Sequence, residues 1–149
     1  MDEQVVAIGS GMEDFERARS ALTSWQHLDI GWLAVHPQTP DVAAGAVVAV
    51  LVHHLGFWSL NACRVLYTVE PGADDCARFG FAYGTLTNHA ESGEELFEVF
   101  IEPDWRVMYR IRAVSWPRAA LAQAGYPVVR WLQARFRRDS AGAMKRALD

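Results

Sequence analysis

One carboxylate falls on an apolar strand face, where it could transfer protons. Phe97, Val99 and Ile101 alternate along a predicted strand and therefore share one face. Glu95 extends this face, so we expect its carboxylate to point inward. Because burial disfavours the ionised form, the pKa of Glu95 is expected to rise. Such a group could act as a general acid or base near neutral pH. The competing interpretation is a solvated position at the mouth of the turn, or a simple ion pair.

The preceding predicted strand presents aromatic, hydroxyl and imidazole side chains on one face. In order, this face carries Phe79, Phe81, Tyr83, Thr85, Thr87 and His89. Such a mixture suits a pocket that is apolar at one end and hydrogen-bonding at the other. The His89 imidazole titrates near neutrality and could transfer a proton at the pocket mouth. It could equally be a turn residue bonded to its own loop.

Two further strands supply an arginine and two tyrosines to the predicted pocket. Tyr67 alternates with Val65 and is expected on the inward face, with Arg64 among apolar neighbours. Arg64 either reaches the rim or pairs with a carboxylate such as Glu95, as a buried arginine needs. Tyr109 is also expected inward, where its hydroxyl needs a partner. The arginines that alternate with it are expected in solvent: Arg106, Arg110 and Arg112.

Sequence patterns for metal and nucleotide binding are absent from the chain. The five histidines have no HxH, HxxxH or HExxH spacing, and neither cysteine completes a zinc pattern. Gly9-Ser10-Gly11 precedes a predicted helix but lacks the glycines of a dinucleotide or phosphate loop. We therefore expect no metal and no cofactor.

Hydrophobic periodicity predicts helices at the two ends of the chain and strands between them. Ser10 and Glu13 have the spacing of a capping box, and an apolar stripe then runs to about His27. Period-two alternation and turn residues indicate about six strands between Ile30 and Trp116. Pro117 is expected to open a short helix ending at Gly125, and Pro127 a longer one.

Consecutive strands joined by short turns predict an α+β, β-rich fold. The antiparallel meander is expected to curl into a barrel or a helix-grip sheet, with an N-terminal helix and C-terminal helices against its apolar face. With 149 residues and 51% hydrophobic composition, residues 1–149 are expected to form a single domain. The interior would then be the place for a small-molecule pocket.

Length, charge and cysteine content limit the compartment and the partners. The longest apolar stretch has eleven residues, about half of what a membrane-spanning helix requires, so no membrane span is expected. The acidic start lacks the pattern of a secretory signal, so a cytoplasmic protein with reduced cysteines is the expectation. Monomer and homodimer both remain open.

The charge is distributed unevenly along the chain. Residues 1–117 hold 7 basic and 16 acidic residues, whereas residues 118–149 hold 7 basic and 2 acidic ones. Such a tail could contact nucleic acid or anionic lipid, but its charges are spread around a predicted helix without an aromatic stacking platform. We interpret it as a solvated helix face and expect no nucleic-acid partner.

Most of the chain resembles a known family, most specifically over residues 78–144. The resemblance rests on Arg78–Leu86, His89, Glu91–Phe97, Tyr109–Pro117, Gly125–Arg130, Gln133, Arg135-Phe136, Asp139-Ser140 and Ala143-Met144. These stretches are similar to the bacterial and plant family known as domain of unknown function 1990. Thr87-Asn88 departs from the Pro-Gly that the family tends to have before the histidine, and Trp116 from its arginine. The resemblance implies a small β-rich body with a pocket for hydrophobic small molecules. The chain also looks related to small barrel cyclases of polyketide pathways.

The leading hypothesis is a cofactor-independent cyclase or isomerase that acts on a hydrophobic, polyketide-like substrate, for example by spiroacetal formation. Glu95 would be the principal acid or base, Tyr83 and His89 its partners, and Arg64 would tune the carboxylate. The residues expected to contact substrate are Phe81, Thr85, Phe97, Tyr109, Tyr67 and Trp32. The alternatives are a non-catalytic binding protein for lipids or other hydrophobic ligands, and an interaction module that uses the basic C-terminal helix.

Overall fold

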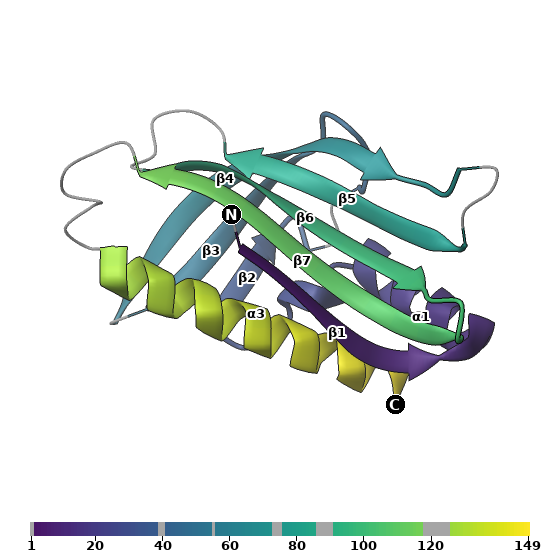
Figure 1. Cartoon of the computed structure of the whole chain (residues 1–149). Helices are drawn as coiled ribbons and strands as arrows, with labels where there is room; N and C mark the ends of the chain where they lie inside the picture. Colours follow the sequence, from purple (N-terminus) through teal and green to yellow (C-terminus); the bar gives the residue numbers. More distant parts are fainter. Residues whose placement is uncertain (1, 39–40, 55, 73–75, 86–90, 118–125) are drawn as a thin grey trace.

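The computed structural model has an α+β architecture in which one antiparallel sheet is covered on one face by helices (Figure 1). It describes residues 2–38, 41–54, 56–72, 76–85, 91–117 and 126–149. The elements in chain order are β1 (Asp2–Ser10), α1 (Gly11–Thr23), the 3-10 turn η1 (Gln26–Leu28), β2 (Leu33–His36), β3 (Val47–His54), β4 (Phe57–Val69), β5 (Arg78–Thr85), β6 (Glu91–Ile101), β7 (Arg106–Pro117) and α3 (Tyr126–Leu148).

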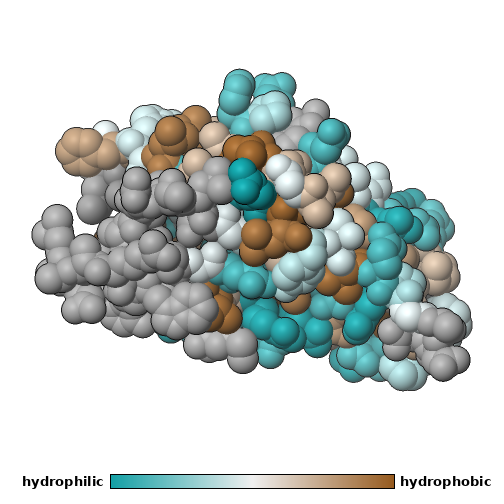
Figure 2. Space-filling model, turned by 90° about the horizontal axis from the view of Figure 1, so that it is seen from above, coloured by the Kyte–Doolittle hydropathy of each residue, from teal (hydrophilic) through white to brown (hydrophobic). Residues whose placement is uncertain are grey.

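The seven strands follow the order β1-β7-β6-β5-β4-β3-β2, and every neighbouring pair is antiparallel. The sheet curls into a half-barrel with α1 and α3 on its concave side (Figure 1). This confirms the predicted fold class and the meander of six strands, β2 to β7. On the outer, convex side, seen from above in Figure 2, hydrophobic patches lie between hydrophilic residues.

The first strand, β1, was not predicted from the sequence. Residues 2–10 alternate only between half-buried and exposed positions, so they lack the strong apolar pattern of a central strand. Their partner is distant in sequence: β1 pairs with β7 at the edge of the sheet. The order is therefore strand, helix, meander, helix rather than helix, meander, helix.

Helix α1 begins where predicted but is capped differently. Ser10 is its N-cap, and the Ser10 side chain makes no cap hydrogen bond. Instead, the Ser10 backbone N–H donates to Oδ2 of Asp14 over 2.9 Å, so the predicted pairing with Glu13 is wrong. The helix ends at Thr23, short of the expected end near His27, because Trp25 adopts a left-handed conformation with φ of 62°. The 3-10 turn η1 then follows.

Helix α3 is fastened to the concave side of the sheet by polar side chains. Tyr109 of β7 shares a hydrogen bond of 2.8 Å with Ser140. Near the start of the helix, Arg130 pairs with Asp2 of β1. Gln4 also donates to the backbone carbonyl of Arg137 over 3.0 Å. The longer predicted C-terminal helix is confirmed, whereas the short helix expected from Pro117 to Gly125 falls largely outside the described residues.

A buried ion-pair network on the convex face corrects the expectation that the arginines of β7 face solvent. Glu98 is 2% exposed and lies 3.2 Å from Nε of Arg78, and Arg110 donates to it over 3.1 Å. Arg110 also stacks over the Phe100 ring, with 4.7 Å from guanidinium carbon to ring centroid. Glycine at position 80 makes this possible, because a Cβ there would lie 3.0 Å from the Cβ of Glu98. Arg106 and Arg112 are more exposed.

Candidate functional site

Glu95 and Tyr83 lie side by side on the concave face. They are directly opposite each other in the register of β5 and β6, and their side chains are hydrogen-bonded. Tyr83 is buried, while Glu95 is half-buried on the same face as the core residue Phe97. The structure thus brings together two of the residues proposed from sequence, a carboxylate and a phenol, on an apolar surface.

The carboxylate of Glu95 influences the proton affinities of its neighbours. Burial raises the pKa of the Tyr83 phenol well above its ordinary value, and the negative Glu95 beside it raises that pKa further. Burial raises the pKa of the Cys63 thiol to about 12, again with a contribution from Glu95. Both groups therefore stay protonated at neutral pH. Tyr83 can donate a hydrogen bond to Glu95 or to a bound oxygen atom.

Tyr109 faces inward, as predicted, and its buried hydroxyl is hydrogen-bonded. Its partner is Ser140 of α3, and both residues are almost completely buried. Burial also raises the pKa of Tyr109 above its ordinary value, although the bond to Ser140 opposes this shift. Sequence reasoning did not find Ser140, because nothing in the periodicity of a helix says which strand it will cross.

A Tyr109→Phe substitution is expected to destabilise the fold by about 1–2 kcal/mol, because it removes the phenol partner of a buried serine hydroxyl. Urea denaturation followed by circular dichroism measures this change. Tyr67→Phe is the matched control, since Tyr67 is exposed and bonds to Glu94 at the surface. An equal loss of stability in both variants would contradict the importance of the buried bond.

Phe81 and Phe97 belong to a packed aromatic cluster on the same face. Both are fully buried, and their ring centroids are 5.7 Å apart. The cluster also encloses His27 of η1, whose ring centroid lies 4.5 Å from that of Phe97 and 5.7 Å from that of Phe81. Phe81 and Phe97, both predicted to contact substrate, therefore belong to the hydrophobic core beneath the Glu95–Tyr83 pair.

His27 is the residue near the site that sequence reasoning missed. It is completely buried, and neither ring nitrogen has a hydrogen-bond partner among the described residues. Desolvation lowers the pKa of His27 to about 3. The imidazole is therefore neutral at physiological pH and carries no proton to or from Glu95. Its position directly after the apolar stripe of α1 was the only signal in the sequence.

Arg64 and Tyr67 do not reach the site. The buried side chains of Cys63 and Val65 occupy the concave face of β4, so Arg64 between them is exposed on the convex face. A β-bulge between Val65 and Tyr67 then shifts the alternation by one residue. As a result Tyr67 also lies on the convex face and donates a hydrogen bond to Glu94. The predictions that Arg64 tunes Glu95 and that Tyr67 contacts substrate are therefore wrong.

Trp32 packs against α3 rather than beside Glu95. Its indole nitrogen donates to Oδ2 of Asp139 over 2.9 Å, and the guanidinium carbon of Arg135 lies 4.7 Å from its ring centroid. His89 and the side chain of Thr85 lie outside the described residues. Of the predicted site residues that are described, the structure thus groups Glu95, Tyr83, Phe81 and Phe97, with Tyr109 behind them.

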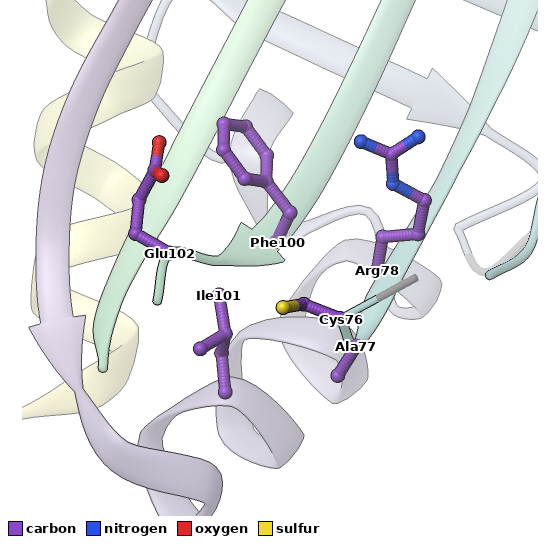
Figure 3. A pocket seen from close by; sticks show the side chains of 6 residues that line it. All are labelled: Cys76, Ala77, Arg78, Phe100, Ile101 and Glu102. Atoms are coloured by element: carbon purple, nitrogen blue, oxygen red, sulfur yellow. The ribbon is translucent and has the colours of Figure 1, made fainter. Parts of the chain in front are cut away.

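A small cleft is found at the opposite end of β5 and β6, with a volume of about 230 Å³. Its lining side chains are Cys76, Ala77, Arg78, Phe100, Ile101 and Glu102 (Figure 3). Glu95 precedes Ile101 by six residues on β6, so this cleft is separate from the Glu95–Tyr83 pair. Within the described part of the chain, no group of three or more His, Cys, Asp or Glu side chains could hold a metal ion.

Comparison with known proteins identifies the family. The model of the family described as "Domain of unknown function (DUF1990)" matches residues 1–143. The chain belongs to the DUF1990 family. Three UPF0548 proteins are similar to it. That of Dictyostelium discoideum is 35% identical over 99% of this chain and 72% of its own length. The Arabidopsis thaliana protein is 34% identical over 93% and 68%, and the Deinococcus radiodurans protein 34% over 95% and 75%.

A solved structure supports the DUF1990 fold seen here. The crystal structure of a hypothetical protein from Helicobacter pylori is similar with a TM-score of 0.64 and covers 99% of this chain and 86% of that one. At 13% sequence identity the likeness concerns the fold alone. Among the described helices, none is both long enough and apolar enough to cross a membrane.

Proposed function

We propose that the protein is a cofactor-independent cyclase or isomerase that acts on a hydrophobic, polyketide-like small molecule. The observation that carries the proposal is the hydrogen-bonded Glu95–Tyr83 pair on the apolar concave face. Glu95 is the general acid and base. Tyr83 is its hydrogen-bonding partner and orients an oxygen atom of the substrate.

Spiroacetal formation illustrates how one carboxyl group can serve both proton transfers. A hydroxyl of a dihydroxy ketone first adds to the carbonyl group to give a hemiacetal. The protonated Glu95 then donates a proton to the hemiacetal hydroxyl, which leaves as water and generates an oxocarbenium ion. The second hydroxyl attacks this carbon and loses its proton to the Glu95 carboxylate. One water molecule is released, and Glu95 returns to its starting state.

The surroundings of the pair favour such chemistry. Phe97 shares the concave face of β6 with Glu95, and its buried ring makes the surroundings of the carboxyl group apolar. The raised pKa of Tyr83 keeps its phenol protonated, so that it can donate a hydrogen bond to a substrate oxygen. Glu95 is half-buried, and its Oε2 atom lies in the protein interior, so the carboxyl group is in apolar surroundings.

A non-catalytic hydrophobic-ligand binding protein is the second candidate. The packed cluster of Trp25, His27, Phe81 and Phe97 favours it, because these rings make the region beneath the Glu95–Tyr83 pair apolar. In this case the Glu95–Tyr83 pair would only anchor the polar end of the ligand. The two candidates differ in turnover and not in binding.

The test uses a symmetric δ,δ′-dihydroxy ketone as probe and measures formation of the spiroacetal by chiral gas chromatography. The uncatalysed reaction gives a racemate, so an enantiomeric excess reports the protein-bound reaction. We expect Glu95→Gln to lower the rate by about a hundredfold or more. Glu94→Gln is the matched control, because Glu94 is adjacent in sequence but bonds to Tyr67 on the convex face.

The outcomes separate the candidates. A folded Glu95→Gln variant that retains the wild-type rate would refute the assignment of Glu95. If the wild-type protein binds the ketone in calorimetry but gives no enantiomeric excess, the cyclase proposal fails for this substrate class and the binding candidate is favoured.

A further inference from the structure

Large apolar side chains are exposed on the β3–β4 hairpin and on the first turns of α3. Phe57 and Trp58 at the start of β4 are 72% and 57% exposed, and Leu60 follows them at 60%. On α3, Trp131 is 58% exposed and Val128 lies one turn before it, also exposed. We call these five residues the apolar rim. Water-exposed side chains of this size mark an interaction surface when they are contiguous.

A chain of contacts joins the two parts of the rim. The Trp58 ring stacks on His53, with 4.7 Å between centroids. The backbone N–H of His53 donates to the carbonyl of Trp32 over 2.9 Å. The Arg135 guanidinium carbon in turn lies 4.7 Å from the Trp32 ring centroid and 5.7 Å from that of Trp131. The hairpin and the first turns of α3 are thus linked through Trp32, and both lie at the same end of the molecule (Figure 1).

The charge around the rim is positive although the whole chain is negative. Residues 47–64 and 126–138 contain five arginines and not one aspartate or glutamate. Asp2 and Asp139 pair with four of these five arginines, and two carboxylates against five guanidinium groups leave an excess of positive charge. A surface of this composition attracts anions, whereas the chain as a whole, with a net charge of −4, does not.

We propose that the apolar rim docks onto the surface of a lipid bilayer that contains anionic headgroups. Tryptophan prefers the headgroup region, because its ring is apolar and its N–H is polar. Phe57 and Leu60 would enter the acyl boundary, and the arginines would contact the headgroups. A second copy of the chain fits less well, because a symmetric contact would bring the same arginines together. Nucleic acid offers no apolar environment for Leu60 or Val128.

The docking surface adjoins the Glu95–Tyr83 pair but does not depend on its activity. Asp2 lies in the same cross-strand row as Glu95 and pairs with Arg130 of α3, beside the rim. The residues of β4 before Cys63 extend beyond the last residue of β5 at this end of the sheet. A docked molecule would therefore present the end of the sheet that holds Glu95 to molecules dissolved in the bilayer.

Vesicle co-sedimentation of the full chain tests the proposal. We expect binding to vesicles of phosphatidylcholine mixed with phosphatidylglycerol, weaker binding to phosphatidylcholine alone, and a decrease with added salt. The Trp58→Ser/Trp131→Ser double variant is expected to bind about tenfold or more weakly, since two large rings no longer enter the bilayer. Trp105→Ser is the matched control, because Trp105 is 59% exposed in the β6–β7 turn at the other end of the sheet.

Circular dichroism establishes that the variants are folded. If the double variant unfolds, Phe57→Ser takes its place, and quenching of wild-type tryptophan fluorescence by brominated lipid gives a second readout. Wild-type binding by the rim variants, or an equal loss with Trp105→Ser, would overturn the proposal. The proposal would also be overturned if the protein did not bind vesicles and instead used the apolar rim to form a homodimer or to bind single-stranded nucleic acid.

Discussion

When the pH is lowered from about 7 to about 4.5, a His27→Phe variant is expected to lose roughly 3 kcal/mol less stability than the wild-type protein. His27 is completely buried between aromatic rings, and desolvation lowers its pKa to about 3 in the folded state. In the unfolded chain the same imidazole has its ordinary pKa near 6.5.

The sign of the effect follows from where the proton binds. Between pH 6.5 and about 3 the unfolded chain binds a proton at His27 and the folded protein does not. Protonation therefore stabilises the unfolded state, and the free energy of unfolding falls as the pH falls, by about 1.4 kcal/mol per unit. Phenylalanine suits the aromatic surroundings and does not titrate, so this part of the pH dependence disappears.

Urea denaturation at a series of pH values measures the difference between the two proteins. His53→Phe is the control, because His53 is exposed to solvent on β3. The carboxylates are the same in both proteins, so their contribution to the pH dependence cancels in the comparison. Parallel stability curves for wild type and His27→Phe would show that His27 finds a proton-stabilising partner in the folded protein.

Gly80→Ala is expected to destabilise the protein by about 3 kcal/mol, a large effect for the addition of one methyl group. A Cβ at this position would lie 2.5 Å from the backbone carbonyl oxygen of Phe97 and 3.0 Å from the Cα of Glu98. Both atoms belong to the backbone of the neighbouring strand β6, so neither can move without opening the pairing of β5 with β6. The displaced Glu98 would also separate from Arg78 and Arg110.

Gly84 on the same strand provides the comparison. A Cβ there would first meet Cδ1 of Leu66 at 3.0 Å, the end of an exposed and flexible side chain. We expect Gly84→Ala to change the stability by less than about 1 kcal/mol, because alanine also reduces the entropy of the unfolded chain. Thermal denaturation of the two variants distinguishes the positions. Similar melting temperatures would contradict a specific close approach at Gly80.

The fold could be predicted where the local pattern and the tertiary structure agree. The alternation in β5 and β6 places Tyr83 and Phe97 on one face, and the structure has both in the core. Strand β1 lacked such a pattern, because its stability comes from pairing with β7, more than a hundred residues away. Local periodicity contains no information on such a pairing.

The candidate site could be predicted to the same extent as the fold, and the wrong predictions about it have similar causes. The alternation of side chains placed Glu95 and Tyr83 on the same face correctly, since the pairing of β5 with β6 has no register shift. It misplaced Tyr67, because the bulge in β4 inserts one residue and exchanges the faces beyond it. It missed His27 because burial of an imidazole without a hydrogen bond runs against the usual behaviour of polar groups.

The half-barrel leaves a gap between its edge strands β1 and β2, and α3 occupies the concave side in place of further strands. A strand would be held there by a ladder of backbone hydrogen bonds, whereas α3 is held by side chains such as Ser140, Asp139 and Arg130. Because its backbone bonds are internal, the helix can slide or tilt without breaking any of them. The distance between α3 and the sheet is therefore set by side chains alone, by these polar contacts and by the packing of Met144 and Leu148 in the core.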